Sequence, residues 1–417
     1  MKLLIKTFGC SLNQSDSEQL KGFLKSFNVL FTSDLNKANT VIINSCGVKE
    51  QTETNVLRLL RKLEKERKKR KFKLIVTGCL PAINNKAIME VSKSILLFGA
   101  GPKEFKKIAK KLKLKEKKLS FKPVKQNKFI GILPAGNGCL GECSYCATKH
   151  ARGTLKSVPI KELVKRFKFL VKDSKEIWLT AQDLSAYGKD LNTNLLELLK
   201  ALLQVKGNYR VRLGMMNASH LKKYLNKLLE LMKKDERTYK FFHLPLQSGS
   251  DKILKQMNRT YKVKEFLETV KKARKEIPDI TISTDIIVGF PGESEKDFQE
   301  TLKVVKQVKP GTINISRYGK RLNTLASEMQ GQLHGRDKKE RSRKLTKLSR
   351  EIKLKENQKL VGKKFEVLFT EKGTKEGFVG RTKNYKTVVV KENVLGETRK
   401  VLITKASENF LKGKIVY

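Results

Sequence analysis

The segment Gly138-Cys139-Leu140-Gly141-Glu142-Cys143-Ser144-Tyr145-Cys146 places three thiols on one short loop at the spacing C-x3-C-x2-C. Thiolates are soft ligands that suit an iron–sulfur cluster. A four-iron cube normally takes four cysteines, so three would leave one iron open for a small molecule. The alternatives are buried free thiols or a zinc site. Zinc sites usually pair one C-x2-C with a second Cys or His pair, and none lies near this loop.

Strand-like and helix-like segments alternate on both sides of this loop. The pattern predicts strands at 129–133, 176–180, 210–213, 241–246, 281–288 and 312–316, and helices at 159–171, 194–205, 220–233, 263–275 and 294–308. Pro159 is expected in the first turn of its helix. Six strands joined by helices predict a parallel, incompletely closed barrel, (β/α)6, with its chemistry at the C-terminal strand ends.

The N-terminal part repeats a strand–cysteine–helix plan three times, which predicts a parallel α/β sheet. The strands are expected at 2–8, 41–46 and 74–79, and the first two helices at 16–27 and 52–69. Cys10, Cys46 and Cys79 end the three strands, and a glycine stands beside each of them. Burial as small apolar residues is the alternative for each alone. Three equivalent positions favour a second, three-cysteine cluster.

The C-terminal part predicts a basic helix and then a small all-β barrel. The helix covers 335–359, and Leu345, Leu348 and Ile352 share one face, which should dock. Short strands are expected at 364–370, 377–381, 387–390, 399–405 and 415–417. Small basic barrels often bind oligonucleotides, and Tyr385 and Phe378 are candidates for base stacking. The alternative for the basic helix is that its charged face is only solvated. The alternative for Phe378 is that its ring is buried in the barrel.

Composition points to a nucleic-acid partner. The 417 residues contain 91 Lys and Arg against 41 Asp and Glu, a formal charge of +50. Such an excess favours a polyanion, although a lysine-rich proteome would contribute part of it. The chain shows no signal peptide and no apolar run long enough to span a membrane, so we expect a cytoplasmic protein with reduced thiols. Domains are predicted at 1–122, 125–354 and 355–417, with the first boundary near residues 122–127.

A resemblance covers nearly the whole chain. The segments that carry it are Thr7–Cys10, Asn44–Cys46, Val76–Cys79, Gly138–Pro159, Ile177–Asp183, Arg212–Asn217, Leu246–Asp251 and Thr284–Glu293. In this order they resemble the radical S-adenosylmethionine (SAM) tRNA methylthiotransferases, of the archaeal and eukaryotic threonylcarbamoyladenosine type. The C-terminal barrel is similar to a TRAM domain, an RNA-binding appendage of that family.

The resemblance implies a reaction and its cofactors. Cys139, Cys143 and Cys146 would hold the radical SAM 4Fe-4S cluster, and Cys10, Cys46 and Cys79 an auxiliary 4Fe-4S cluster. One SAM would methylate sulfur on the auxiliary cluster, and a second would yield the radical that activates an adenosine C–H bond. The product would be 2-methylthio-N6-threonylcarbamoyladenosine at tRNA position 37. An electron donor protein is implied, whereas the sulfur source stays open.

The residues that contact SAM are expected at the loop and at the strand ends. Tyr145 would pack near the adenine, Gln182 and Asp183 would meet the methionine or ribose, and Gly289 to Glu293 would lie against the adenine. An ordinary turn and helix start is the alternative for Gly292 and Glu293.

One segment departs from the family pattern, and two rival functions stand beside the resemblance. The family usually carries Arg-Pro-Gly-Thr after the sixth strand, where this chain has Arg321-Leu322-Asn323-Thr324, which puts the local turn in doubt. The rivals are methylthiolation of a ribosomal protein residue and an RNA-binding protein of the same fold without chemistry.

Overall fold

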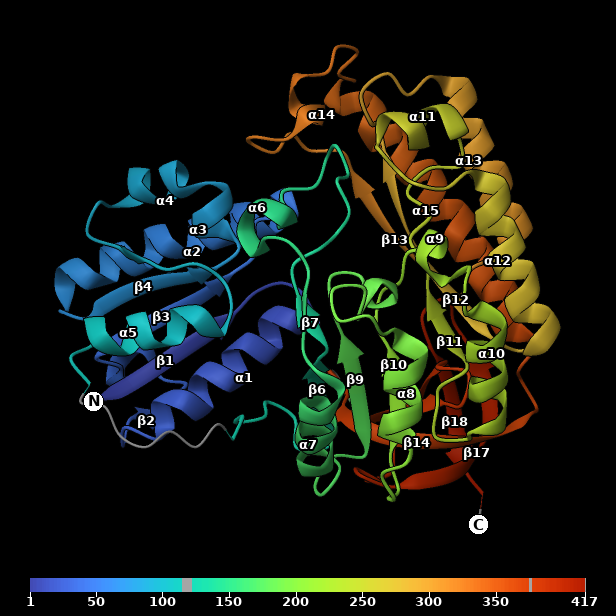
Figure 1. The fold of residues 1–417 in the computed structure, drawn as a ribbon, viewed down its shortest axis with the longest axis horizontal. Helices are drawn as coiled ribbons and strands as arrows, with labels where there is room; N and C mark the ends of the chain where they lie inside the picture. The colour runs from blue at the N-terminus through green and yellow to red at the C-terminus, as the bar shows by residue number, and fades with distance from the viewer. Residues whose placement is uncertain (115–121, 375–376, 417) are drawn as a thin grey trace. The chain divides into compact units, whose positions relative to one another are not determined.

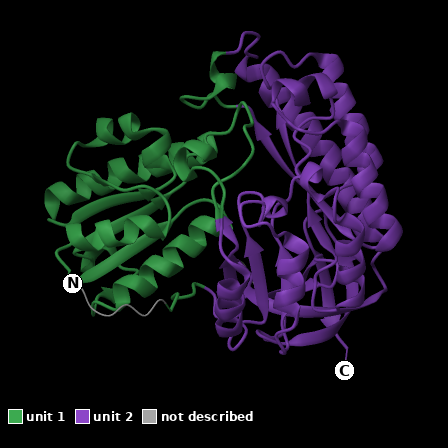
Figure 2. Ribbon diagram, viewed as in Figure 1, with its two compact units in different colours: residues 1–126, 137–156, 319–328 green, residues 127–136, 157–318, 329–417 purple. Residues whose placement is uncertain are grey.

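The computed structural model describes residues 1–114, 122–374 and 377–416, and the chain divides into two compact units (Figure 2). Unit 1 comprises residues 1–126, 137–156 and 319–328, and unit 2 comprises 127–136, 157–318 and 329–417. Unit 1 therefore contains the N-terminal segment and the loop with Cys139, Cys143 and Cys146. Unit 2 contains the strands of the predicted barrel and the C-terminal β-barrel.

Unit 1 is built on a five-stranded sheet whose strands are all parallel, as predicted (Figure 1). The strand order is β2 (Leu30–Phe31), β1 (Lys2–Thr7), β3 (Thr40–Ser45), β4 (Lys73–Gly78), β5 (Leu96–Leu97). The helices are α1 (Ser11–Lys25), α2 (Glu50–Lys69), α3 (Leu80–Ile83), α4 (Asn85–Val91), α5 (Phe105–Lys111), α6 (Thr148–Arg152) and α14 (Leu325–Glu328). The edge strands β2 and β5 were not predicted, because two residues carry no periodic signal.

Alternation of side chains along the strands gives the sheet of unit 1 two apolar faces. Leu3, Ile42 and Ile75 pack with Phe23 of α1 and Phe105 of α5 on one face. A second cluster on the other face joins the strands to α2 and α4; it includes Leu4, Val41, Ile43, Leu74, Val76, Val56, Leu60 and Ile88. The sheet is thus the middle layer of three.

Unit 2 contains the six predicted parallel strands in chain order. They are β6 (Ile130–Pro134), β9 (Glu176–Thr180), β10 (Arg210–Leu213), β11 (Phe241–His243), β12 (Thr281–Val288) and β13 (Thr312–Arg317). Isolated bridges, such as Met215 with His243, join β10 to β11, so the two three-stranded sheets continue one another. The helices are α7 (Ile160–Leu170), α8 (Leu195–Leu203), α9 (Ala218–Leu221), α10 (Leu225–Lys234), α11 (Asp251–Gln256), α12 (Val263–Glu276), α13 (Glu295–Val308) and α15 (Gly335–Gln358).

Three details of the barrel differ from the prediction. Pro159 is the N-cap of α7 and does not lie in its first turn. The predicted strand 241–246 ends at His243, because Pro245 lacks an N–H to continue the ladder. The predicted helix 220–233 is split between α9 and α10, and Tyr224 at the break donates a hydrogen bond from its hydroxyl to the carbonyl of Ser185.

The C-terminal strands form a closed barrel, as predicted. Its order is β14 (Lys364–Lys372), β15 (Phe378–Thr382), β16 (Thr387–Val390), β18 (Leu411–Ile415), β17 (Thr398–Ala406). The bounds of the predicted last strand, 415–417, are wrong, since the strand covers Leu411–Ile415; Tyr417 of that prediction lies outside the described residues. Gly413, which suggested a turn, lies inside this strand, where a Cβ would be 2.3 Å from Cγ1 of Val401.

The basic helix α15 docks through the face that was predicted. Leu345 is buried, and Leu348 and Ile352 pack beside it against β12, β13 and α13. Arg341 of the same helix is buried and pairs with Glu293 at 2.6 Å. The opposite face carries exposed cations: Arg336, Lys339, Arg343, Lys344, Lys347 and Arg350.

The C-terminal barrel contacts the strands of the larger barrel within unit 2. Tyr385 donates a hydrogen bond to Glu176 at 3.1 Å, and its ring lies 4.7 Å from that of Tyr239 and 4.8 Å from that of Phe241. The same Glu176 accepts hydrogen bonds from Trp178 and Tyr239. Tyr385 is therefore not free to stack on a base, and the prediction that it does is wrong. Phe378 packs against the core of its own barrel, which agrees with the alternative given for it.

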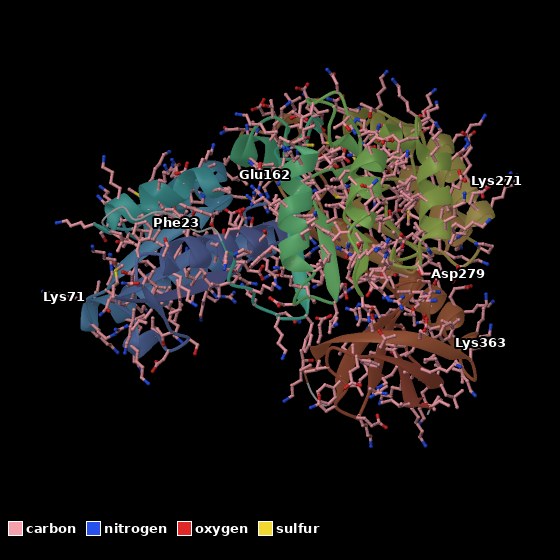
Figure 3. The ribbon with its side chains drawn as sticks, turned by 60° about the horizontal axis from the view of Figure 1, so that its bottom comes forward. Phe23, Lys71, Glu162, Lys271, Asp279 and Lys363 are labelled. Carbon is pink, nitrogen blue, oxygen red and sulfur yellow. The ribbon has the colours of Figure 1, made fainter. Side chains whose placement is uncertain are left out.

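Positive charge covers both units. Figure 3 shows nitrogen-tipped side chains along the surface, including Lys71 of unit 1 and Lys271 and Lys363 of unit 2, all exposed. Within the described ranges, no helix combines the length and the apolar character needed to cross a membrane.

Two glycines allow a matched test of the packing in unit 2. A Cβ on Gly249 would lie 2.5 Å from Cα of Thr301 and 2.8 Å from the carbonyl oxygen of Glu300, both backbone atoms of α13. Gly335 starts α15 with no atom within 4 Å of such a Cβ. We expect Gly249→Ala to lower the free energy of unfolding by about 1–3 kcal/mol, measured by urea denaturation. Gly335→Ala should leave it unchanged or raise it by up to ~1 kcal/mol; equal effects would contradict this packing.

Candidate active site

The first cysteine triad lies at one edge of the unit 1 sheet. Strands β1, β3 and β4 are neighbours, and their registers pair Thr7 with Asn44 and Ser45 with Gly78. Cys10, Cys46 and Cys79 follow the three strand ends, and parallel strands bring their C-terminal ends to the same edge. Cys46 and Cys79 are buried, whereas Cys10 is exposed; all three are free thiols. The predicted convergence of these cysteines agrees with the topology.

Two glycines make room for this triad. Gly9 has φ +108°, and a Cβ on it would lie 2.6 Å from Cβ and 3.2 Å from Sγ of Cys46. Gly78 has φ +95°, and a Cβ there would lie 2.3 Å from the carbonyl oxygen of Ser45. Both positions require glycine, since an L side chain would be strained and would clash. The glycines thus let the three strand ends approach closely.

Burial raises the pKa of two thiols of the first triad. It raises the pKa of the Cys79 thiol to about 12, with Arg152 acting in the opposite direction. Burial also raises the pKa of Cys46, while hydrogen bonds from the backbone N–H groups of Val48 and Lys49 lower it. Only thiolates bind metal, so loading a metal here must release protons.

A buried arginine reaches this triad from the second cysteine segment. Arg152 of α6 donates hydrogen bonds to Asp16 at 2.7 Å, to Asn13 at 2.6 Å and to Asn137 at 2.9 Å. The thiol of Cys79 lies 3.8 Å from the same oxygen of Asn13. The sequence analysis missed this role of Arg152, because Arg152 and Asp16 are far apart in the chain.

The second triad is held by a tight backbone turn. Gly138 has φ +79°, and a Cβ on it would lie 2.0 Å from the carbonyl oxygen of Thr154, so only glycine fits. Cys139 donates its N–H to the carbonyl of Gly153 at 3.1 Å. The N–H of Gly141 points to Sγ of Cys139 at 3.3 Å, and N–H···S bonds of this kind stabilise a thiolate.

The second triad and its flanks belong to unit 1. Helix α6 packs on α3 through Ala147 and Ala151, which lie in one cluster with Cys79, Ile83 and Ala100. The backbone N–H of Ala326 donates to the carbonyl of Ser144 at 2.8 Å. Among the described residues, no group of three or more Cys, His, Asp or Glu side chains is placed to hold a single metal ion. Whether each triad ligates an iron–sulfur cluster stays a prediction.

The segment that departs from the family pattern keeps a defined turn. Arg321 forms a buried ion pair with Glu53 at 2.5 Å, and Thr324 donates its hydroxyl to the carbonyl of Arg321 at 2.8 Å. Asn323 has φ +61°, a left-handed conformation that asparagine tolerates better than other side chains. Asparagine is therefore compatible with the conformation of this turn, at the position where the family usually has glycine.

The residues predicted to contact SAM are divided between the units. Tyr145 lies half-buried in the cysteine loop of unit 1, whereas Gln182, Asp183 and the segment 289–293 follow strand ends in unit 2. Oε1 of Gln182 is buried without a hydrogen-bond partner in the described part of the chain, as is Oε1 of Gln247, whose φ is +69°. Unsatisfied buried acceptors are rare, and strained backbone often marks functional sites. A bound ligand with donor groups would satisfy both.

Asp183 follows Gln182 and is fully engaged by the protein. It accepts hydrogen bonds from the N–H groups of Ser185 and Asn217 and interacts with Nδ1 of His220 at 2.9 Å. Burial alone would raise the pKa of Asp183, but these partners hold it below its ordinary value. Asp183 therefore shapes the turn after β9, and its predicted contact with SAM stays a prediction.

A backbone hydrogen bond and an ion pair with Arg341 hold the loop from Gly289 to Glu293. Glu293 accepts the N–H of Gly289 at 2.7 Å and pairs with Arg341; burial raises its pKa. Gly289 and Gly292 have φ of +72° and +76°. Ser294 caps α13. The alternative of a turn and helix start thus describes the local structure, and the contact of Gly289 and Glu293 with adenine stays a prediction.

Three families match this chain. Residues 2–99 match an uncharacterised protein family, UPF0004, residues 133–305 match the radical SAM superfamily, and residues 358–416 match the TRAM domain. A probable threonylcarbamoyladenosine tRNA methylthiotransferase of Pyrococcus horikoshii is 38% identical over 433 residues, covering all of both chains. The threonylcarbamoyladenosine tRNA methylthiotransferase of Homo sapiens is 34% identical, covering all of this chain and 74% of the human one.

The chain belongs to the threonylcarbamoyladenosine tRNA methylthiotransferase family. Solved structures agree on the fold of this family member. The radical SAM methyltransferase TsrM from Kitasatospora setae, solved with cobalamin and a [4Fe-4S] cluster, has a TM-score of 0.58 at 12% identity, covering 78% of this chain and 76% of TsrM. The cobalamin-dependent radical SAM enzyme OxsB gives 0.52 at 10% identity, covering 78% of this chain and 54% of OxsB.

The ion pair of Arg152 and Asp16 predicts a non-additive response in this family member. Arg152→Met would leave the Asp16 carboxylate buried without a partner, at a cost of about 3–5 kcal/mol in the free energy of unfolding. Adding Asp16→Asn should recover a large part of that loss. Urea unfolding of the reduced, metal-free full chain measures both variants. A double variant no more stable than Arg152→Met would show that the pair does not hold α6 on α1.

Proposed function

We propose that this protein transfers a methylthio group to N6-threonylcarbamoyladenosine at position 37 of tRNA, with SAM and two 4Fe-4S clusters. The observation that carries the proposal is the 38% identity with the Pyrococcus horikoshii relative over the whole of both chains, with both cysteine triads in place. A methyltransferase or an RNA-binding protein does not need two separate three-thiol sites.

The thiols are the residues that would hold the clusters. Cys139, Cys143 and Cys146 would ligate the cluster that binds SAM, and Cys10, Cys46 and Cys79 the auxiliary one. When bound, the clusters and SAM supply the radical chemistry and the sulfur that methylthio transfer to an aromatic C–H requires. The donor set fits, since every thiol is free and backbone N–H groups point to Cys46 and Cys139.

Other residues of the chain prepare the two sites. Arg152 places a buried positive charge beside the first triad, which offsets the negative charge of three thiolates. Gln182 has a buried acceptor at the end of β9, and we expect it to accept a hydrogen bond from the methionine or ribose part of SAM. Asp183 with His220, and Glu293 with Arg341, hold the flanking turns rigid.

The partners follow from charge and from the reaction. The surplus of 50 positive charges and the exposed face of α15 suit the phosphate backbone of tRNA. The reaction requires an electron donor protein and a sulfur source, and we place it in the cytoplasm, where thiols stay reduced. A ribosomal protein substrate is the rival within enzymes, and a non-catalytic RNA-binding protein is the rival outside them.

The metal content after anaerobic reconstitution tests the two clusters. We expect about eight irons per chain in the parent and about four in a Cys10→Ala, Cys46→Ala, Cys79→Ala variant. Iron and acid-labile sulfide are measured together. Four irons in both proteins would make the first triad structural and reduce the protein to a single-cluster radical SAM enzyme. A parent without iron would favour the RNA-binding rival.

Nucleoside mass spectrometry of tRNA from a deletion strain tests the substrate. We expect 2-methylthio-N6-threonylcarbamoyladenosine to disappear and N6-threonylcarbamoyladenosine to accumulate. Expression of the parent chain should restore the product, and the triple cysteine variant should not. Unchanged tRNA, together with the loss of a methylthio group from a ribosomal protein, would overturn the proposal in favour of that rival.

A further inference from the structure

Unit 2 contains a cavity of about 260 Å³ between the larger barrel and the C-terminal barrel. Its wall on the larger barrel consists of Arg212, Phe241, His243, Thr281, Ser283, Thr312 and Asn314. These are alternate residues of β10 to β13 and therefore share one face of the sheet. Residues between them, such as Val211, Phe242 and Ile282, face the helices in the main core. The cavity thus lies on the inner face of the barrel.

Arg212 lines this cavity without an acceptor. No residue in the described part of the chain accepts a hydrogen bond from it or forms an ion pair with it, and its Nε is buried and unsatisfied. Its guanidinium carbon lies 5.7, 5.3 and 5.4 Å from the ring centroids of Trp178, Phe241 and Tyr385. The rings hold the guanidinium in place but accept none of its hydrogen bonds, and a buried donor without a partner is costly.

The nearby acids are already engaged and cannot take that role. Glu176 accepts hydrogen bonds from Trp178, Tyr239 and Tyr385. Asp285 accepts from Asn314 at 2.6 Å and interacts with Nε2 of His243 at 3.1 Å. Glu371 pairs with Arg381 at 3.1 Å, and Glu408, the acid that lines the cavity, forms no ion pair or hydrogen bond with Arg212 in the described structure. An anionic ligand is therefore the missing partner of Arg212.

The rest of the wall is polar and has a second cation. Lys386 donates to Asn357 at 3.2 Å, and no carboxylate of the described residues lies within ion-pair distance of it. Ser283, Asn314 and His243 add hydroxyl, amide and imidazole groups on the barrel side. Such a wall suits a small group with one carboxylate and several hydrogen-bonding atoms.

We propose that this cavity receives the threonylcarbamoyl group of the substrate nucleoside and that Arg212 binds its carboxylate. The inference rests on the proposed function, which supplies the nucleoside. The group has a carboxylate, a hydroxyl and a carbamoyl amide, and the base of unmodified adenosine has none of these. It contains roughly ten non-hydrogen atoms, the size of a small ligand fragment. Arg212 is then a specificity-determining residue, since a site built for a polar group rejects analogues that lack it.

Binding to two synthetic anticodon stem-loops tests the proposal. The RNAs differ only in the presence of the threonylcarbamoyl group on the adenosine, and affinities for the purified full chain are measured by fluorescence anisotropy. We expect the parent to prefer the modified RNA by at least about tenfold, the range of a charged hydrogen-bonded pair. Arg212→Gln should lose this preference and keep its affinity for the unmodified RNA.

Arg210→Gln is the matched control. Arg210 lies two residues earlier on the same face of β10, but its guanidinium is 3.9 Å from Glu366 and it does not line the cavity. This variant should keep the preference. Arg212→Lys, which keeps the charge but not the planar fork, should retain part of it. Circular dichroism and thermal unfolding confirm that each variant folds.

A third RNA tests the carboxylate without any substitution in the protein. It bears the methyl ester of the threonyl group, and the parent should bind it no more tightly than the unmodified RNA. Equal binding of ester and acid would overturn the proposal, as would a parent without preference. An equal loss for all RNAs in Arg212→Gln would assign Arg212 to the phosphate backbone. If the preference holds but the reconstituted protein forms no methylthio product, the proposed function fails and the carboxylate site stands.

Discussion

The buried ion pair between Arg152 and Asp16 is the constraint on which the candidate chemistry depends. Arg152 belongs to α6, directly after the second cysteine loop, and Asp16 belongs to α1, directly after Cys10. Neither charge is stable in a protein interior without the other. The pair therefore fixes α6 against the N-terminal sheet and makes the two cysteine triads parts of one compact unit. The two sets of candidate ligands are therefore held in a fixed relation to each other within unit 1.

Three of the unsatisfied polar groups of unit 2 differ in chemical kind and in place. Gln182 and Gln247 present acceptors at the C-terminal ends of the strands, whereas Arg212 presents donors on the inner face below them. Three titratable pairs of the same barrel are satisfied: Asp183 with His220, Asp285 with His243, and Glu293 with Arg341. Surplus acceptors suit a ligand with a positive charge and hydroxyls, and surplus donors suit an anion. The larger barrel therefore has polar groups that suit two chemically different ligands.

Local patterns made much of this architecture predictable. The strands 281–288 and 387–390 match the structure residue by residue, and the cysteine spacing and strand ends located both triads. The errors have local causes, such as Pro245, which ends a strand early, and Gly413, which lies inside a strand and not in a turn. Arg152 was not recognised because its partner, Asp16, is distant in sequence. Arg212 was not recognised because its distinguishing feature is the lack of an acceptor. Neither leaves a periodic signal in the sequence.

The hydrogen bond from Tyr385 to Glu176 has a consequence for how RNA is captured. When an RNA-binding module is tethered by a flexible linker, the bound RNA must still be oriented relative to the catalytic domain. Here the C-terminal barrel is seated on the strands of the larger barrel through Tyr385, Tyr239 and Phe241. An RNA held by the small barrel therefore loses its rotational freedom relative to the large one at the moment of binding. These contacts thus fix one orientation of the small barrel relative to the larger barrel before any RNA is bound.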